Sequence, residues 1–326
     1  MAGVGPERPR DGATSRSREP ATSASRGVAR PVVFVSGAPG NVGSELVRLL
    51  VARGATVRAL VRRPEHGAAL REPNVELVAG DLAEPDTYAG ALAGVASVFV
   101  NSSTLAVRLQ TELVRAAAAA GVGRLVKLSW MGVAGAAQHG LGGPHAAVEE
   151  AMRETGLPAA ILRANAFMQN YLPQIAAPGP SSLYVTSERA RASIVDARDV
   201  AGVAAELLLT ERPLAEVYEV TGPQALSNDE IATTITVVTG RPVGVERLST
   251  GQLADAHHRA GQPEWLAGEL AAAEALREGG ALEPVLDTVE ALLGRPPETF
   301  DRFVRREWEA LRRPGDAAIE RPPATA

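Results

Sequence analysis

Short apolar runs alternate with longer amphipathic stretches through the first half of the chain. The runs are rich in β-branched and aromatic side chains, as expected for strands that are buried on both faces of a parallel sheet. Between them, apolar residues recur at helical spacing, most clearly over 41–54, 104–120 and 144–155. This alternation predicts an α/β fold with a doubly wound parallel sheet, whose ligands bind where the strands end. The predicted strands occupy residues 32–35, 55–61, 74–79, 97–100, 124–128 and 158–162.

The second half of the chain departs from this rhythm and is mainly helical from 250 to 313. Ser227 and Glu230 have the spacing of a capping box, which predicts a helix start. Pro, Gly and Ser are dense over 176–182, which predicts a mobile loop. The other elements expected here are a strand, turn and helix over 193–209 and a further sheet strand over 216–220.

These patterns divide the chain into three parts. Residues 1–30 lack apolar periodicity and are rich in Arg, Ser, Ala, Gly and Pro, which predicts a disordered tail. Residues 31–170 carry the alternation of strands and helices and form the expected Rossmann-type domain. Residues 171–326 are expected to form a smaller, mainly helical lobe that binds substrate, with segments that return to the sheet.

Three regularly spaced glycines follow the first predicted strand. Gly37, Gly40 and Gly43 stand between the run VVFV and a helical pattern. In a dinucleotide site the first glycine permits a tight turn, the second lets the backbone approach a pyrophosphate, and the third lets the helix pack closely on the strand. Free N–H groups at the start of the helix then attract phosphate. The strand–turn–helix context favours a dinucleotide site over a glycine-rich turn without a ligand.

Charged residues at the ends of the next two strands indicate which dinucleotide binds. Arg62 and Arg63 stand where a site for NAD(H) usually has an acid that binds the ribose 2′-hydroxyl. Guanidinium groups pair with a 2′-phosphate, so the sequence favours NADP(H); the alternative is that both arginines are simply solvated. Asp81 ends the third predicted strand and would accept a hydrogen bond from adenine or cap the next helix.

Composition and charge argue against several other classes of function. The 326 residues carry a net charge of −5, which argues against a nucleic-acid-binding surface. No cysteine is present, and the five histidines lack metal-ligand spacing, so no metal site is expected. No run reaches the roughly 18 apolar residues of a membrane span, and residues 1–30 lack the apolar core of a secretory signal. These features favour a cytoplasmic protein with a small-molecule substrate and leave the oligomeric state open.

Two further features of the sequence are interpreted without a role in function. Lys127 is the single lysine of the chain, whereas arginine is abundant, and we attribute this to genomic base composition. Glu149 and Glu150 stand next to each other in a predicted helix, where they are expected on a solvated surface with a packing contact.

Taken together, these motifs resemble the NmrA-like group of atypical short-chain dehydrogenases/reductases, which includes NAD(P)H-dependent quinone reductases. The resemblance covers about residues 31–310 and implies a Rossmann domain, a preference for NADP(H), and a substrate cleft roofed by the C-terminal lobe. The matching stretches are GAPGNVG (37–43), RALVRRP (58–64), GDL (80–82), VKLSW (126–130), HAAVEEAMRETGLPAAILRANAFMQN (145–170), IVDARDVA (194–201), YEVTGPQALSNDEIA (218–232) and GRPPETFDRFV (294–304).

The resemblance also implies roles for the residues that match the cofactor motifs. The glycine loop would hold the pyrophosphate, and the basic residue after the second strand would meet the 2′-phosphate. Residues at the ends of the third and fourth strands would lie near adenine, the adenosine ribose and the pyrophosphate. These residues are Gly37, Gly40, Asn41, Val42 and Gly43 for the pyrophosphate, Arg62 for the 2′-phosphate, Asp81 and Leu82 for adenine, and Asn101 and Ser102 for the ribose and pyrophosphate.

The chain departs from the wider superfamily at the catalytic pair. Standard members use Tyr-x-x-x-Lys, and here the two positions fall near Leu141 and His145. His145 can hydrogen-bond a ribose hydroxyl or move a proton, but it is equally a helix-start residue without a ligand. Ser129 would orient a carbonyl oxygen or act only as a turn residue. The alternative is that the position equivalent to the family's serine is the next residue, Trp130.

The missing pair shifts the expected substrate towards electron-poor acceptors. Hydride transfer depends mainly on proximity and orientation, and a reduced quinone can take its protons from water. We therefore expect an NADPH-dependent reductase of a quinone or a conjugated or aromatic ketone, with a role in secondary metabolism. The alternatives are a non-catalytic regulatory protein that senses NADP(H) and, less favoured, an epimerase or isomerase. The alternative for the substrate-wall candidates is ordinary packing between the lobes. These candidates are Trp130, Phe167, Met168, Asn170 and Tyr171.

Overall fold

A computed structural model describes residues 3, 30–133 and 142–312 of the chain. The expected disordered tail over 1–30 therefore lies almost wholly outside the described residues, as does the tyrosine position near Leu141. Among the residues described, no helix is both long and apolar enough to cross a membrane.

The centre of the fold is a parallel sheet of seven strands in the order β3-β2-β1-β4-β5-β6-β9. Val33 pairs with Val57 on one side and Ser97 on the other, so β1 lies between β2 and β4. The order of the strands reverses at this point, which is where open α/β sheets bind dinucleotides. The predicted fold class is confirmed. The strands are β1 (Val32–Val35), β2 (Thr56–Val61), β3 (Val75–Ala79), β4 (Ser97–Val100), β5 (Leu125–Trp130), β6 (Ala159–Ala164) and β9 (Val217–Val220).

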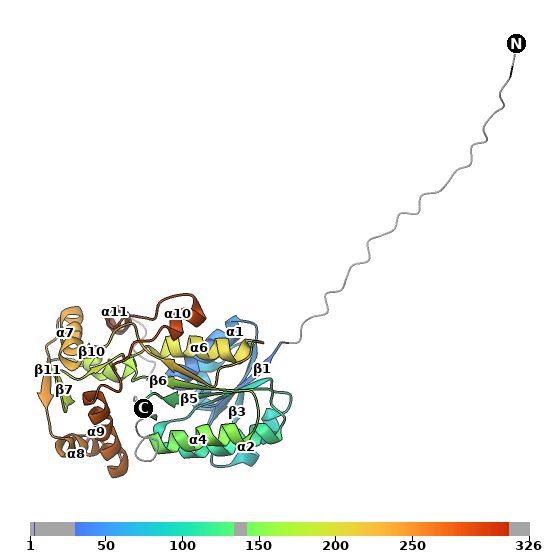
Figure 1. Cartoon of the computed structure of the whole chain (residues 1–326), viewed down its shortest axis with the longest axis horizontal. Coiled ribbons are helices and arrows are strands. Elements are labelled where there is room, and N and C mark those ends of the chain that lie inside the picture. Colours follow the sequence, from blue (N-terminus) through green and yellow to red (C-terminus); the bar gives the residue numbers. More distant parts are fainter. Residues whose placement is uncertain (1–2, 4–29, 134–141, 313–326) are drawn as a thin grey trace.

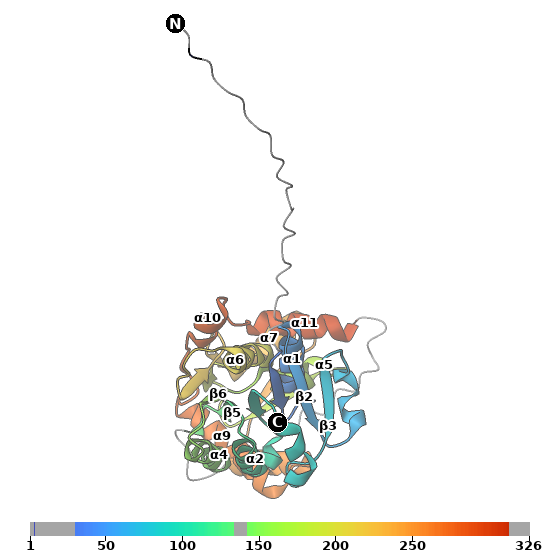
Figure 2. The ribbon, with the colours of Figure 1, turned by 90° about the vertical axis from the view of Figure 1, so that its right-hand side faces the viewer.

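Helices cover both faces of the sheet (Figures 1 and 2). One face carries α1 (Asn41–Ala52) and α6 (Ala197–Leu209), and the other carries α2 (Gln110–Ala119) and α4 (Gly142–Glu154). Helix α1 ends at Ala52, and Gly54 soon after it has a φ of +84°, the left-handed conformation that glycine adopts most readily.

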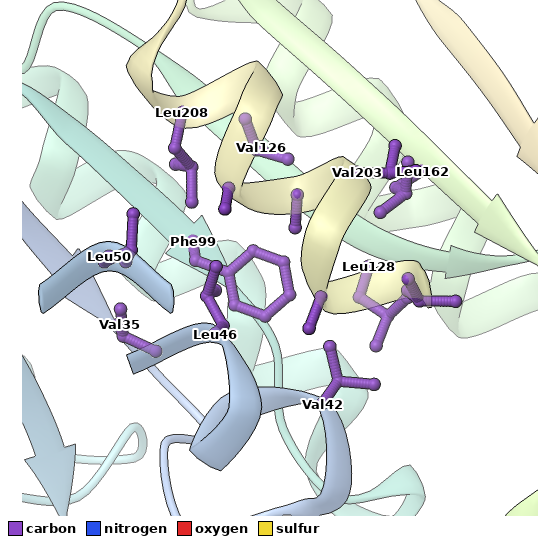
Figure 3. Close-up of a cluster of buried hydrophobic side chains, with 14 of the residues drawn as sticks. Val35, Val42, Leu46, Leu50, Phe99, Val126, Leu128, Leu162, Val203 and Leu208 are labelled. Atoms are coloured by element: carbon purple, nitrogen blue, oxygen red, sulfur yellow. The ribbon is translucent and has the colours of Figure 1, made fainter. Parts of the chain in front are cut away.

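Apolar side chains from α1, α6 and the sheet fill the layer between them (Figure 3). Leu46 and Leu50 of α1 lie beside Phe99 of β4 and Val35 of β1, and all four are completely buried. Leu208 approaches the same layer from α6. The i, i+4 spacing of the two leucines thus gives α1 the apolar stripe that the sequence predicts.

A smaller, mainly helical lobe follows β6. Met168, only seven residues after Ile161 of β6, already lies in the core of this lobe, and because the sheet is parallel the lobe sits at the carboxyl ends of the strands. Two short sheets, β8 with β10 and β7 with β11, support it. Its elements are α5 (Leu172–Ala176), β7 (Ser181–Val185), β8 (Arg191–Ala192), β10 (Leu226–Ser227), α7 (Asn228–Thr239), β11 (Val243–Arg247), α8 (Thr250–Arg259), α9 (Glu264–Glu278), α10 (Thr288–Leu293) and α11 (Phe300–Arg312).

Most predicted elements are confirmed, with two exceptions. The capping box at the start of α7 is present, with the Ser227 hydroxyl accepting from the Glu230 amide and the Glu230 carboxylate accepting from the Ser227 amide. The helix expected over 104–120 begins as a 3₁₀ helix and becomes α-helical at Gln110. The loop expected over 176–182 is wrong at its end, where Ser181 already pairs with Val243 of β11. The 3₁₀ helices are Pro64–Leu70, Pro85–Thr87, Ala89–Leu92, Thr104–Leu109 and Met168–Tyr171.

Two buried aspartates at the start of α6 form ion pairs with arginines of α11 (Phe300–Arg312) and of the segment before it. Asp196 caps α6 through the amide of Arg198, and its other oxygen accepts from Arg306 of α11 at 2.7 Å. One turn later, Asp199 pairs with Arg295 at 2.7 Å. Burial raises the pKa of Asp199, and the arginine opposes that rise.

Removing a leucine from the layer in Figure 3 tests this account of the core. Leu46→Ala is expected to lower the free energy of unfolding by about 2–5 kcal/mol, because it deletes buried methyl groups and leaves a cavity. Val237→Ala on α7 is the control, since Val237 is 72% exposed and its truncation should change stability by no more than about 0.5 kcal/mol. Urea denaturation measures both, and equal costs would contradict the assigned core.

Candidate active site

The glycine loop lies at the carboxyl end of β1 and adopts the geometry that a dinucleotide needs. Gly37 has a φ of +64°, and a Cβ built there would lie 2.8 Å from the side-chain amide nitrogen of Asn101. A Cβ at Gly43 would overlap the carbonyl oxygen of Gly37 and come within 2.8 Å of Ala38 Cα. Only glycines allow this close approach, which brings the start of α1 against the end of β1.

The start of α1 has no side-chain cap. Gly40 is the N-cap residue, and helix α1 begins at Asn41 and Val42, the two other residues that the resemblance assigns to the pyrophosphate. The first amides of the helix therefore keep hydrogen-bonding capacity for an anion. A cradle that is closed to side chains and lined by such amides fits the pyrophosphate of a dinucleotide.

Two arginines follow β2 on the same edge of the sheet. Arg62 and Arg63 are both exposed, and within the described part of the chain neither forms an ion pair. The neighbouring Arg58, by contrast, is held by Glu76 and by two backbone carbonyls. Arg62 and Arg63 thus offer two uncommitted guanidinium groups where a 2′-phosphate would lie.

Residues at the ends of β3 and β4 border the same edge. One carboxylate oxygen of Asp81 accepts from the amide of Ala83 at 2.9 Å, so Asp81 closes a local turn. The side chain of Leu82 belongs to the core beneath this turn. Asn101 lies beside Gly37, and Ser36 fixes its backbone by accepting from its amide at 2.9 Å.

A chain of buried hydrogen bonds starts at Ser102 and ends on α4. The Ser102 hydroxyl accepts from Gln110 Nε2 at 2.8 Å, and Gln110 Oε1 accepts from Lys127 Nζ at 2.8 Å. Lys127 Nζ also lies 3.1 Å from His145 Nδ1. Burial lowers the pKa of Lys127 to about 7, and burial together with the lysine charge lowers the pKa of His145 to about 3.

A second group of hydrogen-bonded side chains lies beside the first, and each group contains one pair between β5 and α4: Lys127 with His145, and Ser129 with Glu149. Ser129 donates its hydroxyl to Glu149 Oε1 at 2.6 Å, and Arg163 Nη2 donates to Glu149 Oε2 at 2.6 Å. Lys127 and Ser129 are two residues apart on a strand, so they point to the same face of the sheet, towards α4. Glu149 is buried, and the expectation that it lies on a solvated surface is wrong, although Glu150 is exposed.

The expected substrate-wall residues occupy different environments. The half-buried indole of Trp130 lies over Gly132, where a Cβ would overlap the ring. Phe167 is half-buried and forms a bridge with Val195, whereas Met168 lies inside the lobe core. Asn170 is exposed. The structure therefore places Trp130 next to the polar residues of β5, whereas Met168 is buried in the core of the lobe.

The sequence analysis missed four residues of these two hydrogen-bond networks, namely Gln110, Lys127, Glu149 and Arg163. A signal was present. A lone lysine interrupts an apolar strand two residues before Ser129, and His145 and Glu149 are four residues apart on one helix. Matching strand and helix spacings of polar residues would have pointed to a buried network. Within the described residues, no cluster of histidine and acidic side chains could hold a metal ion.

Comparison with known proteins places the chain in a family. The model of the NmrA-like family matches residues 30–303. The chain belongs to the NmrA-like family. Its resemblance to this group, expected from the sequence motifs, is thereby confirmed.

Two characterised relatives of this NmrA-like protein are reductases. The chain is 34% identical to the NAD(P)H azoreductase of Xenophilus azovorans over 283 residues, which are 86% of this chain and 99% of the relative. It is 35% identical to the (4-alkanoyl-5-oxo-2,5-dihydrofuran-3-yl)methyl phosphate reductase of Streptomyces griseus, covering 86% of this chain and 97% of the relative. The structure of the NADPH-dependent quinone oxidoreductase QOR2 from Escherichia coli in complex with NADPH has the same fold, with a TM-score of 0.74, 24% identity, and coverage of 84% and 99%.

Removing Glu149 tests the second polar pair. Glu149→Ala leaves the partly buried Arg163 without its carboxylate, so we expect the free energy of unfolding to fall by about 3–5 kcal/mol. Glu150→Ala is the matched control on the next residue, and because its ion pair with Arg153 is exposed it should cost less than about 1 kcal/mol. Chemical denaturation measures both variants, and a Glu149→Ala protein as stable as the control would refute the buried pair.

Proposed function

We propose that this protein transfers a hydride from NADPH to a quinone or to another conjugated, electron-poor acceptor such as an azo compound or an aromatic ketone. The observation that supports this most directly is the combination of a dinucleotide cradle at the β1–β4 switch point with a neutral histidine on α4, His145, which contacts Lys127 of β5. The chain is an NADP(H)-dependent reductase of the atypical short-chain type, in agreement with the relatives over nearly its whole described length.

The residues present fit the cofactor. In this proposal the loop from Gly37 to Gly43 and the first amides of α1 hold the pyrophosphate, and Arg62 and Arg63 hold the 2′-phosphate. Asp81 and Leu82 border adenine, while Asn101 and Ser102 border the ribose and pyrophosphate. The bound nicotinamide supplies a hydride. The cytoplasmic location expected from the sequence remains part of the proposal.

The acceptor would lie between the polar pairs of β5 and α4 and the lobe at residues 171–326. Trp130 and Phe167 are half-buried and can present aromatic surface to a flat acceptor, while Met168 supports that surface from the lobe core. Asn170 is exposed at the rim. His145 would face the acceptor as a hydrogen-bond donor, and Ser129 would position α4 because its proton is given to Glu149.

Oxidation of NADPH in the presence of quinones, azo dyes and aromatic ketones tests the activity. We expect acceptor-dependent oxidation that falls by more than about a hundredfold in Gly40→Asp, because a carboxylate there would repel the pyrophosphate by several kcal/mol. Gly90→Asp is the control, since a Cβ at Gly90 meets no atom within 4 Å. Tight binding of NADPH without any oxidation would instead identify the non-catalytic sensor.

Cofactor preference is tested separately at Arg62. Arg62→Ala should raise the Kd of NADPH about 10- to 100-fold, because it removes charged hydrogen bonds to the 2′-phosphate worth about 1.5–3 kcal/mol. The Kd of NADH should stay unchanged. Arg71→Ala, another exposed arginine beyond the same strand, is the control. Fluorescence titration measures these constants, and an equal loss for both cofactors would show that Arg62 does not read the phosphate.

A further inference from the structure

Lys127 has a hydrogen-bond partner inside the protein for each of its three N–H donors. Its side chain is completely buried, and its Nζ lies 2.8 Å from Gln110 Oε1, 3.0 Å from the carbonyl oxygen of Leu128 and 3.1 Å from His145 Nδ1. An ammonium group has three N–H donors and no acceptor. Each of its three neighbours must therefore accept one hydrogen bond when Lys127 is charged.

The neighbouring groups fix these directions. The Ser102 hydroxyl donates to the carbonyl of Ser103, so its oxygen accepts from Gln110 Nε2. The amide oxygen of Gln110 is thus turned towards Lys127. With two N–H groups given to Gln110 and Leu128, the third meets His145 Nδ1, and the proton of the neutral imidazole must reside on Nε2.

The charges around this pair keep the imidazole neutral. Burial lowers the pKa of Lys127 to about 7 against the opposing effect of Glu149 on α4, and Glu149 is itself paired with Arg163 of β6. Gln110, the neighbour from α2, carries no charge. Burial and the charge of Lys127 lower the pKa of His145 to about 3. Near neutral pH, therefore, Lys127 exchanges a proton while His145 changes only its tautomer.

We propose that Lys127 supplies the proton for the reduction and that His145 delivers it, an inference that rests on the proposed reductase activity. As the acceptor gains the hydride, the Nε2–H bond of His145 breaks and its proton joins the oxygen or nitrogen of the acceptor. At the same time Nδ1 takes a proton from Lys127 Nζ. The lysine becomes a neutral amine, and the imidazole remains neutral with its proton now on Nδ1.

This exchange is balanced and reversible. The lone pair of the neutral amine accepts from Nδ1–H at the place where the ammonium donated before, so all three contacts of Nζ persist. A proton from solvent then restores the ammonium and the Nε2–H tautomer. Lys127 thus acts through His145 and needs no contact with the acceptor, which explains how a site without the usual tyrosine can still protonate its product.

The tautomer of His145 tests the proposal without any cofactor or acceptor. In protein labelled with ¹⁵N-histidine, the ring nitrogens of His145, assigned by their loss in His145→Gln, should show the Nε2–H tautomer below a midpoint near pH 7 and the Nδ1–H tautomer above it. Lys127→Met should abolish this switch. Gln110→Glu places a carboxylate against Nζ and should move the midpoint up by about one pH unit or more.

Kinetics provide the second readout. Above the same midpoint the kcat of the native protein should fall about tenfold per pH unit, because the proton on Nε2 is then absent. Lys127→Met should be about 10²–10⁴-fold slower with no such fall, and in Gln110→Glu the fall should move upward with the tautomer midpoint. A tautomer that does not change with pH, or one that still switches in Lys127→Met, overturns the proposal even if quinones are reduced. A protein that switches tautomer but reduces no acceptor overturns the proposed function instead.

Discussion

The close approach of α1 to the end of β1 is the constraint on which the rest of this site depends. Any side chain at Gly43 would collide with the backbone of Gly37 and Ala38. Because the helix starts so close to the strand, its first amides point to the gap between β1 and β4. Ser36, which follows β1, joins this end of β1 to the end of β4 by donating its hydroxyl to the carbonyl of Asn101 at 2.8 Å. These backbone contacts fix the start of α1, where the proposed pyrophosphate site needs no charged side chain.

Strand β5 carries opposite chemistry on its two faces. Val126 and Leu128 point into the apolar layer beneath α6, as Figure 3 shows, whereas Lys127 and Ser129 point towards α4. Burying charged groups costs free energy unless each finds partners, and here every donor of Lys127 has one. The apolar face stabilises the sheet and thereby allows the polar face to be arranged for chemistry.

Sequence reasoning succeeded where one local pattern determines the outcome. The run before Gly37, the glycine spacing and the capping box at Ser227 each act over a few neighbouring residues, and each was interpreted correctly. The strands β5 and β6 were expected to end at Leu128 and Leu162, but both continue, and Ser129 pairs with Arg163 in register. That pairing, and the burial of Glu149 between them, depends on contacts between residues far apart in the chain, which a single sequence does not display. The attribution of the single lysine to base composition stays a prediction, and it gave no indication that Lys127 is buried and hydrogen-bonded.

The two polar pairs also show that strand and helix have matching repeats here. Two residues of a strand advance by about 6.6 Å, and four residues of a helix advance by about 6 Å. Because the two advances are nearly equal, Lys127 contacts His145 and Ser129 contacts Glu149. Their alignment depends on this shared repeat. The two pairs that serve the proposed chemistry therefore stay in register together or shift together.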